Sequence, residues 1–139
     1  MKSRLITLSA VITAFFLVMP AFAKRSPPKP VEPVAKDGIE YSAGPTAAPE
    51  GFVVATWTDG KRKVEIWRRQ IYTIKHEYKL GLERDVQTCF ITKLEFENGK
   101  LMIWNERSGE FELDLDTLEV KVLKGQALID FTDRDPPKE

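Results

Sequence analysis

The feature that most constrains the fold is a series of short segments over 51–132 in which apolar and polar residues alternate between turn residues. A period of two places apolar side chains on one face of a β-strand. The pairs Asp59-Gly60 and Asn98-Gly99 tolerate the positive φ of tight hairpin turns. The sequence therefore predicts an all-β domain over 51–132, an antiparallel meander of about six strands with no amphipathic helix of any length.

The expected strands cover residues 52–57, 64–74, 86–97, 100–105, 111–115 and 118–122. Within 86–97, the residues expected on one face are Val86, Phe90, Leu94 and Phe96. The alternation slips near Arg68-Arg69-Gln70, which predicts a bulge or bend there because a slip of one residue reverses the faces of a strand. Residues 127–131 fit either a short strand or coil.

A single meandering sheet cannot bury its own apolar face. We expect the sheet to curl into a small barrel or to fold over as a sandwich, with the slip near Arg69 as a corner. The alternatives are that a second copy or a larger partner covers the apolar face. Dimerisation would also bury the edges of the sheet.

The first 23 residues have the three zones of a secretory signal peptide, with a basic start, an apolar run over 5–19, and Pro20-Ala21-Phe22-Ala23. The small residues Ala21 and Ala23 predict cleavage after Ala23. An uncleaved anchor is the alternative, but the apolar run is shorter than the ~20 residues that span a bilayer. The chain is therefore expected to be periplasmic or secreted, with no transmembrane anchor after processing.

Residues 24–50 are rich in proline, with six prolines among them. Proline favours extended chain, and large apolar side chains are few, so this segment is predicted to be a flexible tether. A Pro-rich ligand for an aromatic groove of a partner is the alternative. Residues 133–139 are predicted to be a disordered tail.

Residues 99–120 carry Gly-Lys-Leu, a turn, an aromatic residue, Leu-Asp and a second turn. This order resembles a blade of the pyrroloquinoline-quinone-type β-propeller repeats, and residues 53–67 are similar to the outer strands of another blade. Residues 85–92 also resemble small exported bacterial proteins with a blade-like domain. The resemblance implies about one and a half blades, too few for a closed ring. No quinone-binding residue can be matched, so we expect no cofactor.

Three residues offer candidate chemistry, namely His76, Glu77 and the lone cysteine, Cys89. A Cys-His couple can form a thiolate nucleophile, and His-Glu can exchange protons, as in a small envelope enzyme or redox factor. None of the usual sequence frames around a catalytic cysteine is present, so no catalytic residue is assigned. We interpret Cys89 as a small buried hydrophobe, with a redox or intermolecular thiol as the alternative.

Asp114, Asp116 and Glu119 flank a hairpin turn and could hold a calcium ion weakly. We interpret them instead as the solvated face of a strand and the side-chain caps of its turn. No metal site is predicted.

Basic and aromatic residues interleave near the first hairpin and form a candidate surface for an anionic ligand or a partner. Its members are Trp57, Lys61, Arg62, Lys63, Trp67, Arg68 and Arg69. Lysine and arginine supply charge and the indole rings supply stacking area. The chain as a whole has 21 basic and 21 acidic residues, which argues against nucleic acid as the partner.

These patterns together predict a non-enzymatic exported β-domain that acts as a binding or assembly accessory in the bacterial cell envelope. Its expected partner is another protein or a second copy of itself.

Overall fold

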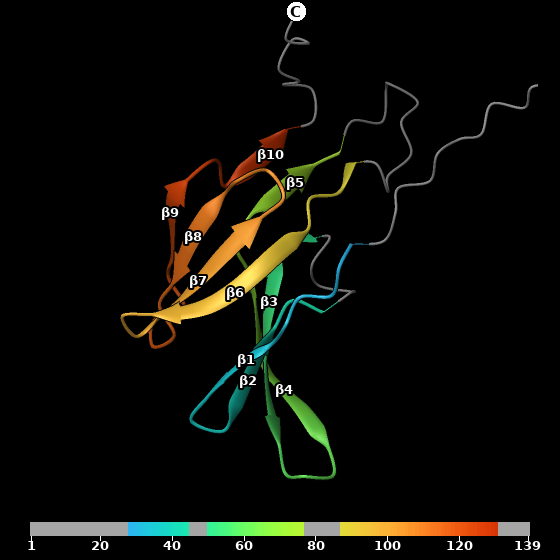
Figure 1. Cartoon of the computed structure of the whole chain (residues 1–139), viewed down its shortest axis with the longest axis vertical. Coiled ribbons are helices and arrows are strands. Elements are labelled where there is room, and N and C mark those ends of the chain that lie inside the picture. Colours follow the sequence, from blue (N-terminus) through green and yellow to red (C-terminus); the bar gives the residue numbers. More distant parts are fainter. Residues whose placement is uncertain (1–27, 45–49, 77–86, 131–139) are drawn as a thin grey trace, which may run out of the picture.

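The computed structural model describes residues 28–44, 50–76 and 87–130. All regular structure in this part of the chain is β, in ten strands and without a helix (Figure 1). The predicted all-β class is confirmed. The predicted antiparallel meander of about six strands is wrong, because the described part of 51–132 holds eight strands and two of them pair in parallel. The described residues contain no helix of the length and hydropathy needed to cross a membrane. The predicted signal peptide and the tail over 133–139 lie outside the described residues.

The strands form two antiparallel four-stranded sheets and one parallel pair. The first sheet holds β1 (Val34–Lys36), β2 (Ile39–Ser42), β3 (Phe52–Thr58) and β4 (Lys63–Gln70) in that order. The second sheet holds β6 (Ile91–Glu97), β7 (Lys100–Asn105), β8 (Glu110–Leu113) and β9 (Val120–Lys124). The parallel pair is β5 (Thr73–Lys75) with β10 (Leu128–Asp130).

The core lies where the apolar faces of the two sheets meet. Tyr41 of β2 makes an edge-on ring contact with Phe96 of β6, with centroids 5.6 Å apart. Tyr72, which follows β4, stacks on Phe111 of β8 at 5.4 Å. Buried residues come from both sheets and from β10, and include Val53, Ala55, Ile91, Leu94, Leu101, Ile103, Leu113 and Ile129. The chain therefore covers much of its apolar face by folding over itself.

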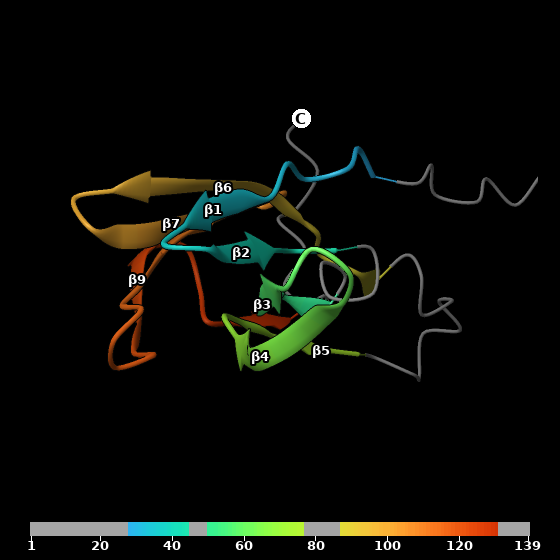
Figure 2. The same cartoon turned by 90° about the horizontal axis from the view of Figure 1, so that it is seen from below.

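The first sheet approaches the second where β1 lies beside β6 (Figure 2). Among the described residues the two four-stranded sheets are not joined into one, because neither outer strand of the first sheet, β1 or β4, pairs with β6 or β9 of the second. Of the two expected arrangements, the described part of the chain therefore forms packed sheets and not a closed barrel.

The prediction of a flexible tether over 24–50 is wrong for residues 34–42, which form the β1–β2 hairpin. Asp37 and Gly38 take φ values of 53° and 79°, which allows a two-residue turn between paired Lys36 and Ile39. Tyr41 is only 5% exposed because it packs in the core. The high proline content of 24–50 as a whole predicts extended chain, although the few turn and apolar residues within 34–42 have the spacing of a hairpin.

The predicted bulge in the second strand of the first hairpin exists, but it lies earlier than expected. The pairing of β3 with β4 shifts register between Ala55 and Thr56, which leaves Ile66 as the extra residue of β4. The expected strand over 64–74 is also divided into β4 and β5, because Ile71 and Tyr72 turn into the core between them.

A second register shift lies between Ile91 and Lys93 of β6. It places Ile91 and Leu94, three residues apart, in the core, and Cys89 is buried beside them. The prediction that Phe90, Leu94 and Phe96 share one face assumed unbroken alternation. With the shift, Leu94 is buried, whereas Phe90 and Phe96 are only partly buried against the core. Val86 lies outside the described residues.

Candidate functional site

The face of the first sheet that forms the core continues beyond the core toward the end of the β3–β4 hairpin. Tyr41, Ala55 and Trp67 are paired across three strands, and this row packs against the second sheet. Two residues further along, Ile39 is paired with Trp57, and Trp57 with Val64. Since directly opposed residues share a face, this second row lies on the same face as the first.

The second row is covered at Ile39, which packs against the core, but the described chain leaves its other two residues open. Trp57 is 47% exposed and Val64 49%, whereas Ala55 of the first row is fully buried. Ile66, the bulged residue of β4, is also 49% exposed. Figure 1 shows the β3–β4 hairpin extending away from the second sheet. We call Ile39, Trp57, Val64 and Ile66 the hairpin surface.

The seven residues predicted from the sequence do not share one surface. Trp57, Trp67 and Arg69 lie on the core-side face of the hairpin, and Trp67 is half-buried against the ring of Tyr41. Lys63 and Arg68 are paired with Thr58 and Val54, which places them on the opposite face. Lys61 and Arg62 lie in the turn, where Asp59 Oδ1 accepts hydrogen bonds from both of their backbone N–H groups.

Three of the five predicted cations have a carboxylate close by. Arg62 lies 3.7 Å from Asp59, Lys63 lies 2.8 Å from Glu40, and Arg68 lies 3.2 Å from Glu65. Hydrogen bonding to the Glu65 carboxylate raises the pKa of Arg68. Exposed ion pairs of this kind leave less positive charge for a compact anion. Because the basic residues also lie on opposite faces of the hairpin and in its turn, they do not converge on one anion site.

The candidate nucleophile is buried. Cys89 is 1% exposed, and burial raises the pKa of its thiol. Its backbone carbonyl accepts a hydrogen bond of 2.6 Å from the Tyr72 hydroxyl, whose own pKa is raised by burial. A reactive cysteine needs access and a lowered pKa, so the interpretation of Cys89 as a buried hydrophobe is confirmed.

The structure does not bring His76 to the thiol through a shared cavity. His76 lines an open hollow of about 280 Å³ whose other lining residues are Glu50, Phe52, Gln70, Thr73 and Ile74. Cys89 does not line this hollow. Glu77 lies outside the described residues.

Of the three acidic residues near 114–119, Asp114 has the turn-capping role that the sequence predicts. Asp114 Oδ1 accepts hydrogen bonds from the N–H groups of Asp116 and Thr117, and Oδ2 accepts one from Lys100 Nζ. The pKa of Asp114 is lowered, mainly by the hydrogen bond from the Lys100 ammonium and to a smaller extent by these two backbone N–H groups. Within 28–44, 50–76 and 87–130, no cluster of histidine, cysteine and carboxylate side chains has the geometry of a metal site.

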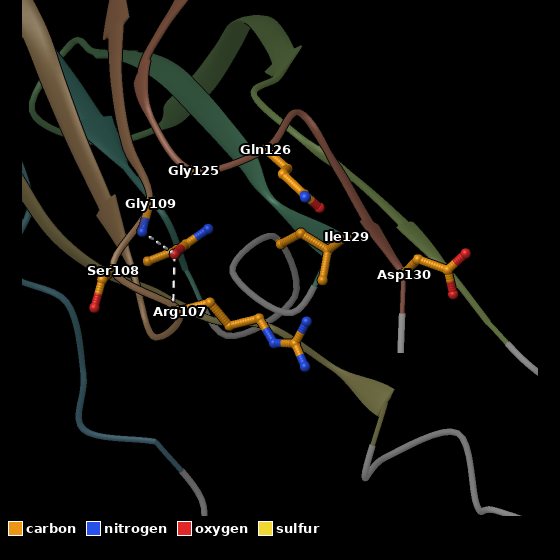
Figure 3. Close-up of a pocket in the computed structure, with 8 residues that line it drawn as sticks. Arg107, Ser108, Gly109, Gly125, Gln126, Ile129 and Asp130 are labelled. Carbon is orange, nitrogen blue, oxygen red and sulfur yellow. Dashed lines mark hydrogen bonds between the residues drawn. The ribbon is translucent and has the colours of Figure 1, made fainter. Parts of the chain in front are cut away.

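A second hollow, of about 520 Å³, lies where the β7–β8 turn meets the segment between β9 and β10. It was not anticipated from the sequence. Its lining residues are Asn105, Arg107, Ser108, Gly109, Gly125, Gln126, Ile129 and Asp130. Figure 3 shows Arg107 and Gln126 extending toward Ile129 from opposite sides, whereas Asp130 points away. The Asp130 carboxylate forms an ion pair with Lys75 at 2.7 Å, so its negative charge is compensated outside this hollow.

Two glycines allow the segments that line this second hollow to lie close together. A Cβ on Gly125 would lie 3.0 Å from the Gly109 Cα, and a Cβ on Gly109 would lie 2.8 Å from the Asn105 side chain. Asn105 Oδ1 holds the turn by accepting hydrogen bonds from the N–H groups of Arg107 and Gly109. The glycines and Asn105 are visible in the sequence, but only the tertiary fold brings 105–109 beside 125–130.

No protein-family model matches this chain, and no curated protein is detectably similar to it. The interpretation of the site therefore depends on its own residues.

Proposed function

We propose that this protein is a non-enzymatic binding module of the bacterial cell envelope, exported by its N-terminal segment, and that it contacts a partner protein through the hairpin surface. The observation that carries the proposal is the exposure of Trp57 and Val64, each close to half exposed, on the face that elsewhere forms the core. The bulged residue Ile66 of the same strand is also 49% exposed. Exposed aromatic and aliphatic side chains that are contiguous and flanked by charges are typical of protein contacts.

The chemistry of the remaining residues supports binding over catalysis. The Cys89 thiol is buried and has a raised pKa, and the Asp114 carboxylate is used in a turn and an ion pair. For the alternative of an envelope enzyme that uses His76, Glu77 and Cys89, the described residues place Cys89 in the core and His76 at a hollow that Cys89 does not line. This alternative predicts that the paired substitutions Cys89→Ser and His76→Ala abolish biological activity without unfolding the protein.

Site-specific photo-crosslinking tests the proposal. A photoreactive residue replaces Val64 of the hairpin surface in one strain and Val122, which is 39% exposed on β9, in a matched strain. The proposal predicts discrete adducts with another protein from position 64 and none from position 122. The absence of adducts from position 64, or equal adducts from both positions, would reject the hairpin surface as the binding surface.

A further inference from the structure

Strand β4 is an outermost strand of the first sheet. It spans eight residues, Lys63–Gln70, and among the described residues it pairs only with β3. All of its residues except Trp67 are exposed. An edge of this length presents a row of backbone N–H and C=O groups that can pair with an incoming strand.

The same strand contributes apolar side chains to the hairpin surface. Val64 and Ile66 belong to β4, and Val64 continues the apolar row across Trp57 to Ile39. An incoming strand would therefore meet hydrogen-bonding groups and apolar contact area at one edge. These are the two requirements of recognition by strand addition, in which backbone pairing supplies affinity and side chains supply selectivity.

The charge of this edge selects its occupant. Residues 61–70 hold five basic residues and one acidic residue. Asp59, Glu40 and Glu65 pair with three of these cations, which leaves a local net charge of +2 on Lys61 and Arg69. Neither Lys61 nor Arg69 has an ion pair with another described residue. A second copy would bring the same charge to the edge, and like charges opposite each other are destabilising. The edge therefore favours an acidic occupant over a copy of this chain.

The other exposed basic edge differs in this respect. On β9, Lys124 lies 3.6 Å from Glu110, and Lys121 is paired in register with Glu112 of the neighbouring strand. These carboxylates compensate the lysines locally. Arg69 of β4 is instead paired in register with Val53. Strand β9 therefore provides a control for the charge of Arg69, which has no neighbouring carboxylate of this kind.

An anionic bilayer would attract the basic residues of this edge but would not provide hydrogen-bonding partners for the exposed backbone groups of β4. Burial of Val64 and Ile66 in hydrocarbon would also bring the edge N–H and C=O groups of β4 into a medium without hydrogen-bonding partners, which is costly. A polypeptide strand satisfies both groups. We propose that β4 receives an extended segment of a partner polypeptide in which acidic and apolar residues alternate, so that the segment becomes a fifth strand of the first sheet.

This inference rests on the proposed function and names the chemistry of the partner. The test uses the purified protein and a capped octapeptide of alternating valine and glutamate. Two related peptides serve as controls: one has lysine in place of glutamate, and one has proline at two central positions, which removes backbone donors. Phosphatidylglycerol vesicles form a fourth arm. Binding is measured by titration, and amide hydrogen exchange locates it.

The valine-glutamate peptide is expected to bind and to slow amide exchange within β4 but not within β9, and both control peptides are expected to bind at least tenfold more weakly. Ile66→Glu is expected to weaken binding at least tenfold, whereas the matched change Val122→Glu leaves it unchanged. Equal binding of the lysine or proline peptide, protection of β9 alone, or binding of vesicles but not of peptide would overturn strand addition.

The two proposals fail separately. If the peptide leaves β4 unprotected while photo-crosslinks from position 64 persist, the hairpin surface binds a partner in another way and strand addition is rejected. If both the peptide and the crosslinks fail, the proposed function is rejected as well.

Discussion

Replacement of Phe111 by alanine is the most informative test of the way in which the two sheets stabilise each other. Phe111 is fully buried on β8, stacks on Tyr72, and is paired in register with Ile103 of β7. Truncation removes the whole ring from the region between the sheets. Phe→Ala changes at such positions cost about 3–5 kcal/mol, because the transfer free energy is lost and a cavity remains.

The expected loss is large for a domain of this size. Small domains unfold with a free energy of about 5–15 kcal/mol, so a loss of about 3–5 kcal/mol is at least a fifth of the stability. With a urea dependence of about 1.5 kcal/mol per molar, a loss of about 4 kcal/mol lowers the unfolding midpoint by roughly 2.5 M. The matched variant Val64→Ala, at a 49% exposed residue, should change stability by no more than about 0.5 kcal/mol.

Urea unfolding followed by circular dichroism at two protein concentrations measures both variants. Equal small effects of Phe111→Ala and Val64→Ala would refute the packing of β8 against the residues that follow β4. A midpoint that rises with protein concentration would show that a second copy covers the apolar face instead.

Three further predictions concern single groups. Tyr72→Phe should cost about 1–3 kcal/mol in urea unfolding, because it leaves the buried Cys89 carbonyl without its donor; an unchanged midpoint would contradict this contact. Cys89 should react with a maleimide reagent far more slowly in the native state than in urea, and rapid native labelling would contradict its burial. The pKa of Asp114 is lower in the folded than in the unfolded protein, so the stabilisation by its carboxylate is present above the unfolded pKa of ~4 and is lost as the pH falls toward the folded pKa. Asp114→Asn should therefore lower the free energy of unfolding at pH 6 and make it depend less on pH in the acid range. An unchanged dependence on acid pH would contradict this role.

Local features of the fold could be predicted from the sequence because they depend on neighbouring residues. The Asn98-Gly99 turn has φ values of 49° and 78°, as the hairpin prediction requires. The β1–β2 hairpin was missed because its Asp37-Gly38 turn lies in a segment dominated by proline. The parallel pairing of β5 with β10 joins Thr73 to Leu128, and no local pattern indicates such a distant partner.

The candidate site was predictable only in part for the same reason. Trp57 was identified from its residue type and its basic neighbours. Val64 and Ile66 were assigned only to a strand, because their exposure depends on where the second sheet stops covering the first. Alternation shows which residues share a face, but only the tertiary packing decides which part of that face stays open.

The central claim is that one copy of the chain buries its own core and leaves the hairpin surface for a different molecule. Sedimentation velocity of the purified protein, with and without Val64→Glu, measures this claim most directly. The account predicts one copy per particle for both proteins across a hundredfold range of concentration. A dimer that dissociates on Val64→Glu would contradict it, because the hairpin surface would then be the contact between two copies.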